Sequence, residues 1–499
     1  FGAFLFMLSF ITKNVYERGN FTSKATEERL DAAYERQYQY LDARPQPRYA
    51  TVDLTVDLFP AERRASYAAE LTLLNVATAD TLFLNWKDFV EVKSLQLNGR
   101  ALPQTWVDEE QQITAYSLPA TVREDSLLQL SLRAEKQYTG FTQSDAQADL
   151  TYVGSMASVQ DLLPIIGYAG DKELSENRQR TEQGLARLDS RMAPVTDPIG
   201  LQQDSYAPDA VAVTGSITIS TPADQIPFAA GKLVSSLEEN DRRTAVYQID
   251  TPMPFNWHLG AADYAQLTGQ AKDLTYTIFH KPTHTFNLEL YQAALQKGID
   301  FMQKYFGATA VTDQLQLVEV HRWQEPTYTF ANTIVLSEKE GWVADTEGLQ
   351  EQAYLYQTIG SGLASLWIQR QLRIANVQGA DMLRKALPEA IGMQFVRTAF
   401  DDEAVELLRK KKMDKYAKDR NNEPNQEPAL LYADGIDYLE VNKGAVVLYD
   451  TMEAMGWEQF QKRLLAWSAA QNTYGTFTDF LDFLGADVAR EVYTQVDGQ

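Results

Sequence analysis

Few residues in this chain could carry metal or acid–base chemistry. It contains no cysteine and only four histidines, His258, His280, His284 and His321. Disulfides and thiolate metal sites are therefore excluded, and any imidazole-based metal site must use these four residues.

His280 and His284 lie in the segment HKPTH and have the spacing of the histidine pair on a zinc-peptidase helix. Such a helix needs a glutamate directly after the first histidine as general base, and this chain has Lys281 there. Pro282 also disrupts the helix that would bring the two rings to one side. We therefore expect no zinc at this pair.

No other residue pattern nominates an active site. Gly360-Ser361-Gly362 precedes a predicted helix, but it lacks the Gly-x-Ser-x-Gly spacing of a nucleophile elbow. No glycine-rich phosphate loop stands out, and nothing pairs a particular serine with one of the four histidines. Residue chemistry alone thus predicts a two-domain body without a detectable active site.

The amino-acid composition limits the class of protein to which the chain can belong and the kinds of partner that it can bind. The chain has 499 residues, of which 44% are hydrophobic and 23% charged, an ordinary globular composition with enough length for two or three cores. Its 45 Lys and Arg against 68 Asp and Glu give a net charge of −23. Because this charge repels phosphate backbones, no nucleic-acid partner is expected.

Residues 1–12 are expected to be the end of a transmembrane helix. The run FGAFLFMLSFI carries no charge, although a helix that spans a membrane needs about 20 apolar residues. A signal-peptide core is the competing interpretation, but the basic residues Lys13 and Arg18 follow the run and no small-residue cleavage site comes after it. Residues 13–47 are expected to form a helical stalk or linker, or a helix packed on the body, that ends near Pro45.

Residues 48–270 are predicted to form an antiparallel β domain. Segments such as TVDLTVDLF alternate with the period of a half-buried strand, and turn residues such as Asn98-Gly99 separate these segments. The sequence from about residue 135 to 209 has no regular hydrophobic pattern and is rich in Gln, Asp, Ser and Pro. This predicts a long insertion in the domain. We expect the whole region to act as a scaffold.

Residues 271–499 are predicted to form a separate domain, because the pattern changes to a strand, LTYTIFH, that is followed by helices. Asn287 can cap a helix that carries apolar residues at helical spacing and stops at Gly307. Residues 357–389 are expected to form two helices joined by a loop around 376–379.

The chain resembles the aminopeptidase N-like zinc metallopeptidases (gluzincins), and more closely the branch of that family fused to ABC transporter permeases in Bacteroidetes-type bacteria. The resemblance covers nearly the whole chain and is carried by segments such as RPQPRYATVDLTVDLFP, RMAPVTDP and FANTIVLSEKEGWVAD. Its most specific segment is IANVQGADML, because this branch has nearly that wording just after its zinc helix. It implies an antiparallel β domain followed by a thermolysin-like, mostly helical α+β peptidase-like domain.

The same segment aligns the family's zinc helix with this chain. The family has the motif His-Glu-x-x-His with a tryptophan two residues further on, and Trp367 holds that tryptophan position. Ser361 and Ser365 then occupy the two histidine positions, and Gly362 occupies that of the general-base glutamate. The third zinc ligand, a glutamate in the family, falls on Lys385.

Two more positions bear on this alignment. The family's transition-state tyrosine precedes a Lys-Gly pair; Lys443-Gly444 is present, but Val441 stands in the tyrosine position. If the register slips, Glu389 becomes the third ligand, although both histidines would still be missing.

The resemblance therefore implies a degenerate member without bound zinc and without catalytic residues. A zinc site needs three protein donors, and two serine hydroxyls with an ammonium group do not supply them. Without the metal, the attacking water keeps a pKa near 15.7. Two orientations are open for Lys385: its ammonium replaces the metal charge beside an acidic group, or it extends into solvent.

The expected function is that of a catalytically inactive, membrane-tethered pseudo-peptidase domain, part of or associated with an ABC transporter permease, on the periplasmic side of the bacterial inner membrane. Its expected partners are the membrane through the N-terminal helix, transporter subunits or other membrane proteins, and a peptide. The alternatives are an active zinc aminopeptidase with an unrecognised site and a structural subunit of a larger membrane complex. The residues expected to line the vestigial cleft are Asn332, Glu338, Trp367, Asn376, Gly379, Glu389 and Lys443.

Overall fold

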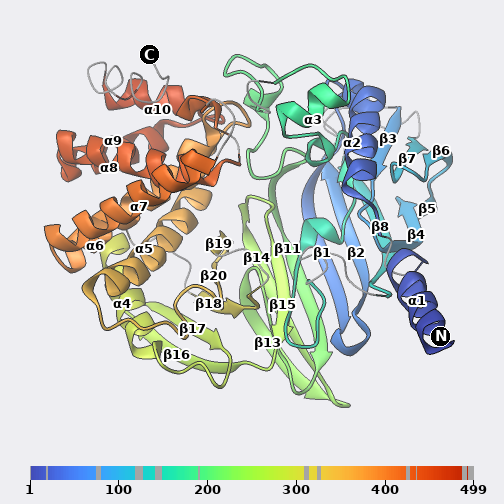
Figure 1. Cartoon of the computed structure of the whole chain (residues 1–499), viewed down its shortest axis with the longest axis horizontal. Helices are drawn as coiled ribbons and strands as arrows, with labels where there is room; N and C mark the ends of the chain where they lie inside the picture. Colours follow the sequence, from blue (N-terminus) through green and yellow to red (C-terminus); the bar gives the residue numbers. More distant parts are fainter. Residues whose placement is uncertain are drawn as a thin grey trace. The chain divides into compact units, whose positions relative to one another are not determined.

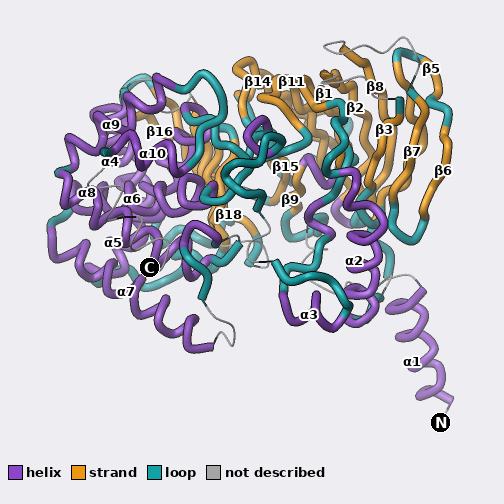
Figure 2. Tube along the Cα trace, turned by 90° about the horizontal axis from the view of Figure 1, so that it is seen from above, coloured by secondary structure: helices purple, strands orange, loops and turns teal. Residues whose placement is uncertain are grey.

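The computed structural model describes residues 2–17, 21–74, 80–118, 127–140, 149–188, 192–307, 314–322, 327–422, 427–433, 435–485 and 492. The chain forms two compact units. Unit 1 comprises Phe1–Leu188 and Asp209–Asp263, and unit 2 comprises Asp189–Pro208 and Tyr264–Gln499. Strands dominate unit 1 and helices dominate unit 2 (Figure 2). The predicted order, an antiparallel β domain followed by a mostly helical α+β domain, is confirmed.

Unit 1 contains an eight-stranded sheet of order β13-β14-β11-β1-β2-β8-β4-β5 (Figure 1), a four-stranded sheet β10-β3-β7-β6 and a three-stranded sheet β12-β15-β9. Neighbouring strands are antiparallel except for β1 and β11, which are parallel. The strands are β1 (Arg48–Phe59), β2 (Arg64–Leu74), β3 (Thr81–Asn85), β4 (Val90–Leu97), β5 (Arg100–Ala101), β6 (Gln104–Asp108), β7 (Ile113–Ser117), β8 (Leu127–Gln137), β9 (Ser155–Ser158), β10 (Ile165–Ile166), β11 (Ala210–Pro222), β12 (Ile226–Ala229), β13 (Lys232–Glu239), β14 (Arg242–Met253) and β15 (His258–Ala262).

The alternating pattern of β1 explains its place in the middle of the large sheet. Val52, Leu54 and Val56 are fully buried, while the intervening Asp53 and Thr55 are exposed. One face of the sheet therefore faces the core and the other faces water, as the two-residue period of a strand requires.

Unit 1 also contains three helices, α1 (Gly2–Thr12), α2 (Lys24–Tyr38) and α3 (Asn177–Glu182). Helix α2 packs on the four-stranded sheet, where Tyr34 is fully buried and its hydroxyl donates to Asn85 Oδ1 at 3.0 Å. This helix, predicted within a stalk or linker, is thus part of the body of unit 1. No helix in the described part of the chain is long and apolar enough to cross a membrane.

Unit 2 is built on a five-stranded sheet of order β16-β17-β18-β20-β19, in which the three inner strands are parallel and the two edge strands are antiparallel to their neighbours. The strands are β16 (Ala265–Ala271), β17 (Leu274–His280), β18 (Gln314–Val320), β19 (Thr327–Phe330) and β20 (Thr333–Ser337). The helices are α4 (Leu288–Phe306), α5 (Leu349–Gln371), α6 (Leu387–Ala399), α7 (Asp402–Asn422), α8 (Ala445–Met455), α9 (Trp457–Ala470) and α10 (Phe477–Leu484).

The division between the units differs from the predicted boundary at residue 270. It falls at Asp263, because β16 pairs with β17 along its whole length and so belongs to unit 2. Residues 192–208 were expected within the insertion of the β domain, yet they also belong to unit 2.

The predicted helix–loop–helix of residues 357–389 corresponds to the end of α5, the loop 372–381, a π-helical turn η9 (Met382–Ala386) and the start of α6. Helix α5 is buried along most of its length, including Ile359, Leu363 and Trp367. It is therefore a central core helix, and any side chain on it must fit its neighbours closely.

In unit 1, a buried ion pair joins α2 to α3. Arg180 donates to both carboxylate oxygens of Glu35, at 2.6 and 2.8 Å, and both side chains are at most 4% exposed. The substitution Glu35→Ala leaves the Arg180 guanidinium buried without its counter-charge, which is expected to destabilise the protein by about 3–5 kcal/mol. Urea unfolding measures this loss.

The matched control is Arg178→Ala, which lies on α3 like Arg180. It removes an exposed ion pair with Glu182. This control is expected to leave the midpoint of urea unfolding almost unchanged, because water and salt screen an exposed pair. Equal losses in the two variants would contradict the assignment of the buried pair as a stabilising contact.

Candidate functional site

Gly362, at the general-base position, allows α5 to lie directly against β20. A Cβ atom at Gly362 would lie 2.9 Å from Ile334 Cδ1 and 3.0 Å from Ile334 Cγ2. A glutamate here would have to displace the side chain of a core residue that is 0% exposed. The position therefore serves packing between helix and sheet, and a carboxylate base does not fit it as the chain is folded.

Ser361, at the first histidine position, faces α6. A Cβ atom at Gly392 of α6 would lie 2.2 Å from Ser361 Oγ, so the two helices touch at this point. The Ser361 hydroxyl is buried and has no hydrogen-bond partner among the described residues. A small residue is required here by the close approach of α6, and an imidazole would not fit without separating the helices.

Ser365, at the second histidine position, connects α5 to the edge strand β19. Its hydroxyl lies 2.7 Å from Thr329 Oγ1, and Gln369 Nε2 donates to both of these oxygens at 3.3 and 2.8 Å. Gln369 also donates to the Thr329 carbonyl at 3.1 Å. These contacts tie the edge strand β19 to α5 at the residue that the sequence resemblance aligns with a zinc ligand.

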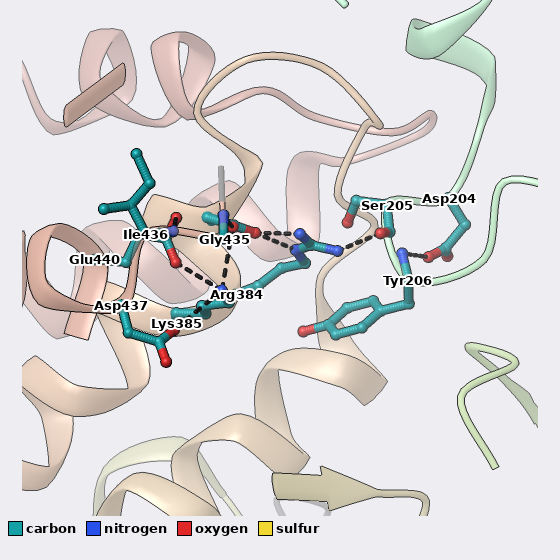
Figure 3. Close-up of polar contacts among 10 residues, drawn as sticks. Asp204, Ser205, Tyr206, Arg384, Lys385, Gly435, Ile436, Asp437 and Glu440 are labelled. Atoms are coloured by element: carbon teal, nitrogen blue, oxygen red, sulfur yellow. Dashed lines mark hydrogen bonds and ion pairs between the residues drawn. The ribbon is translucent and has the colours of Figure 1, made fainter. Parts of the chain in front are cut away.

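Lys385, at the third-ligand position, lies in η9 and binds carboxylates. Its Nζ donates to Glu440 Oε2 at 2.6 Å and lies 3.4 Å from Asp381 Oδ2 and 3.6 Å from Asp437 Oδ1. Glu440 lies in a second π-helical turn, η11 (Tyr438–Gly444), and Asp437 directly precedes that turn (Figure 3). The ammonium is thus paired with acidic groups, while Ser361 and Ser365 make separate contacts with α6 and β19.

The carboxylates around Lys385 differ in ionisation. Burial alone would raise the pKa of Asp381, but the Arg384 guanidinium and the Lys385 ammonium outweigh it and hold the pKa at about 2. Burial and the neighbouring Asp381 carboxylate raise the pKa of Glu440 to about 7, against the opposing effect of Lys385. Burial would lower the pKa of Lys385, yet the same two carboxylates keep it above its ordinary value.

Glu389, the alternative third ligand, is held by two other side chains. Lys412 Nζ donates to Glu389 Oε2 at 2.7 Å, and Gln357 Nε2 donates to the same oxygen at 2.6 Å. Lys412 also donates to the carbonyl of Val441 at 3.0 Å. One buried ammonium on α7 thereby joins α6 to the turn that carries the tyrosine position.

The other residues expected in a vestigial cleft each make a contact of their own. Their contacts are Asn332 Nδ2 to the Gln314 carbonyl (3.0 Å), Glu338 to Lys281 Nζ (2.9 Å), the Trp367 ring to that of Phe306 (4.7 Å between centroids), Asn376 Nδ2 to Gln203 Oε1 (3.3 Å) and Lys443 to Glu427. Gly379 has a φ of 87°, and a Cβ atom there would lie 2.8 Å from Leu431.

His280 and His284 do not form a helical pair. His280 ends β17, and its Nδ1 lies 2.9 Å from the carbonyl of Lys281. His284 Nδ1 contacts the buried Glu319 carboxylate. Within the described ranges, no three His, Asp or Glu side chains are placed to hold a metal ion.

Three important residues of this region were not identified from the sequence: Asp381, Lys412 and Glu440. Lys412 could have been found, because it continues at four-residue spacing the buried stripe of Ala404 and Leu408. Asp381 and Glu440 are single acidic residues in otherwise apolar stretches, ADML and YLEV, and such isolation is a sign of a buried and paired charge.

The architecture described above is that of the two-domain zinc metallopeptidases. No protein-family profile matches this sequence, and no curated protein matches it. Solved structures do match across most of the chain.

A crystal structure of the M1 zinc metallopeptidase from Deinococcus radiodurans has a TM-score of 0.63 at 14% identity, covering 91% of this chain and 94% of that one. A mutant of that enzyme bound to a Tyr-Ser-Ala substrate has a TM-score of 0.63 at 15% identity, with coverages of 91% and 94%. A mutant two-domain M1 zinc metallopeptidase bound to L-tryptophan has a TM-score of 0.63 at 15% identity, with coverages of 91% and 95%. This likeness establishes a shared fold.

The raised pKa of Glu440 predicts a pH dependence of stability. Because its folded-state pKa, about 7, exceeds its ordinary 4.5, Glu440 contributes stability that is fully present below pH 4.5 and is lost as the pH rises through 7. Relative to Glu440→Gln, the wild type is expected to lose about 1–3 kcal/mol of unfolding free energy between pH 4.5 and 8. Urea unfolding at several pH values measures this difference.

Asp437→Asn is the control, since Asp437 is 79% exposed and lies 3.6 Å from the same ammonium. It is expected to leave the pH profile within about 0.5 kcal/mol of wild type. Parallel profiles for wild type and Glu440→Gln would refute the buried-carboxyl interpretation.

Proposed function

We propose that this chain is a catalytically inactive, membrane-tethered aminopeptidase-like domain that belongs to, or associates with, an ABC transporter permease on the periplasmic side of the bacterial inner membrane. Its role is to bind a partner subunit or a peptide. The proposal combines the fold shared with M1 zinc metallopeptidases and the resemblance carried by IANVQGADML.

One observation carries the proposal: the three positions that correspond to zinc ligands are used for contacts within the protein. Ser365 joins a sheet edge, Ser361 fills the contact between α5 and α6, and Lys385 binds carboxylates. A zinc ion needs three donors that converge on one point, and these three side chains have different partners.

The general-base and tyrosine positions support the same proposal. Gly362 has no side chain and its space is occupied by Ile334, and Val441 offers no hydrogen bond to a tetrahedral oxyanion. Water activation and stabilisation of the oxyanion are both lost at the positions where the family provides them.

The decisive test of inactivity is metal analysis together with an aminoacyl-fluorogenic assay. After incubation with zinc and removal of free metal, the wild-type protein is expected to retain much less than one zinc ion per chain, because no carboxylate, imidazole or thiolate stands at a ligand position. Hydrolysis is expected to stay at the level of buffer. Stoichiometric zinc with zinc-dependent turnover would overturn the proposal and favour the active-peptidase alternative.

Helix α1 supports the membrane part of the proposal. Seven of its large apolar side chains are exposed, among them Phe6 at 73% and Phe10 at 49%, and none of its residues is buried. A helix that is apolar on all sides is typical of a lipid environment or of a protein core.

The double substitution Phe6→Asp and Phe10→Asp is expected to weaken binding to phosphatidylethanolamine/phosphatidylglycerol vesicles by at least about tenfold, since two buried phenylalanines contribute several kcal/mol. Co-sedimentation measures the change. Phe286→Asp is the control, because Phe286 is a 79% exposed phenylalanine outside α1. Unchanged vesicle binding of the double variant would argue against a tether at α1. Co-purification in mild detergent then shows whether the protein is alone or is a subunit of a complex.

A further inference from the structure

Residues 192–208, which we call the strap, dock on the loop 372–381 of the same unit. Ser205 N donates to the Ile374 carbonyl at 3.0 Å, and Asp204 and Ala375 form an antiparallel bridge. In the other direction, Asn376 N donates to the carbonyls of Gly200 and Gln203, at 3.0 and 3.1 Å. The strap thus binds the loop through its backbone, as an extended peptide binds an exposed edge.

Backbone packing at Gly200 brings the strap into direct contact with the loop. A Cβ atom at Gly200 would lie 2.5 Å from the carbonyl oxygen of Asn376 and 2.8 Å from Val377 Cγ1. Only glycine allows this approach, because the nearest atom belongs to the backbone and cannot rotate away. A substitution at Gly200 therefore disturbs docking of the strap on the loop without changing a charged group.

Polar and aromatic side chains join the strap to the site described above. Arg384, next to Lys385, donates to the Ser205 carbonyl, and its guanidinium lies 5.6 Å from the centre of the Tyr206 ring (Figure 3). Arg384 also donates to Asp381. Arg384 therefore connects the strap to the loop end that carries the carboxylate cluster.

The strap contains two carboxyl groups, those of Asp197 and Asp204. Asp197 Oδ2 accepts from the amides of Ile199 and Gly200 at 3.0 and 2.6 Å, whereas Asp204 lies at the bridge to the loop. Asp204 is 7% exposed, and its Oδ1 accepts a hydrogen bond from Tyr206 N at 2.8 Å. Burial raises its pKa to about 6, although the amides of Tyr206 and Ala207 and the Arg384 guanidinium favour the charged form. The other charged groups near the contact between the strap and the loop are Asp381, Lys385, Asp437 and Glu440.

The described residues on either side of the strap, Leu188 and Asp209, are held by contacts within unit 1. The Asn177 side chain accepts from the amide of Leu188 at 2.8 Å and donates to its carbonyl at 2.7 Å. At the other end, Tyr49 N donates to the Asp209 carbonyl at 3.0 Å. The strap can therefore leave the loop and return without these flanking contacts being broken.

We propose that the strap is a reversible latch on the loop between α5 and η9, closed in acid and loosened when Asp204 ionises. Closing the latch moves the Asp204 carboxyl from water into the protein, where the ionised form is less well solvated. Opening it frees the amides of Ser205, Asn376 and Gln378, of which the last donates to the Ala193 carbonyl at 2.8 Å. The latch thereby makes the order of the loop, and of Asp381 and Arg384 beside it, dependent on pH.

The direction follows from proton linkage. The closed latch holds the proton of Asp204 up to about pH 6, whereas the carboxyl of the open strap loses it near the ordinary value of 3.8. Closing therefore takes up a proton between these values, and the latch is strongest below pH 4. The opening equilibrium is expected to rise on the order of 100-fold from pH 4 to pH 7, and to change little above.

Hydrogen exchange of the full chain, corrected for intrinsic rates, tests the latch at pH 4.5 and 7.5. The amides of Ser205, Asn376 and Gln378 are expected to lose protection together, by at least tenfold, at the higher pH. In Asp204→Asn their protection is expected to be equal at the two pH values. Independent exchange of the three amides, or an unchanged pH dependence in Asp204→Asn, would overturn the proposal.

Three variants separate the latch from other effects. Gly200→Ala is expected to remove the protection of the three amides at both pH values while amides inside β1 stay protected. Gly170→Ala is its control, since a Cβ there meets nothing within 4 Å. Glu440→Gln is expected to keep the pH dependence of the strap; if it abolishes that dependence while Asp204→Asn does not, the assignment to Asp204 is wrong.

Discussion

The close packing of α5 is the constraint on which unit 2 depends. Glycines at four contact points, Gly298, Gly360, Gly362 and Gly392, let α4, α6 and β20 approach this helix so closely that a Cβ at any of them would lie within 3.0 Å of a neighbouring side chain. Interiors packed at this density do not tolerate added volume. Ser361 and Gly362 of α5 are consequently shaped by contact with α6 and β20, so the identity of these two residues and the tightness of the core are two aspects of one arrangement.

Charge in this region is balanced within the protein. A zinc site concentrates positive charge on one ion, whereas here ammonium and guanidinium groups of Lys385, Arg384 and Lys412 are each placed against a carboxylate. Two of these pairs, Lys385–Glu440 and Lys412–Glu389, join segments that are distant in sequence, whereas Arg384 and Asp381 are three residues apart. The two long-range pairs specify which turns of the chain meet. Pairs of this kind are costly to break one partner at a time, and they favour one arrangement over others even where their net stabilisation is small.

Much of the fold could be predicted from the sequence, because local patterns report local structure. The alternation in β1 and the change of period near residue 274 follow from burial on one face, and each element forms where its pattern predicts it. The sequence alone also shows which residues stand at the positions that the resemblance aligns with the family's zinc ligands and general base. Where Ser361 and Lys385 would point could not, because that depends on Gly392 and Glu440, which meet them only in the folded chain.

The division into two units and the residues predicted to line a cleft show the same limit of prediction from sequence. Residues 192–208 have the composition of an insertion in the β domain, and nothing in their own sequence indicates that their hydrogen-bond partners lie beyond residue 373. Likewise Asn332, Glu338 and Lys443 were grouped through one alignment, yet each has its own partner. Pairings between distant segments are set by tertiary structure and leave no local periodicity.

The path of the chain has a consequence for biosynthesis. It leaves unit 1 after Leu188, supplies a segment to unit 2 and returns at Asp209 before the rest of unit 2 has been made. Gln203 and Asn376, which meet in the folded protein, are 173 residues apart, so at 5–20 residues per second the ribosome needs roughly 10–35 s to deliver the second after the first. During that interval Tyr206 and the apolar residues beside it have no surface to cover them. The nascent chain thus passes through a stage in which a chaperone is most useful, and unit 2 cannot be obtained intact by cutting the gene at a single point.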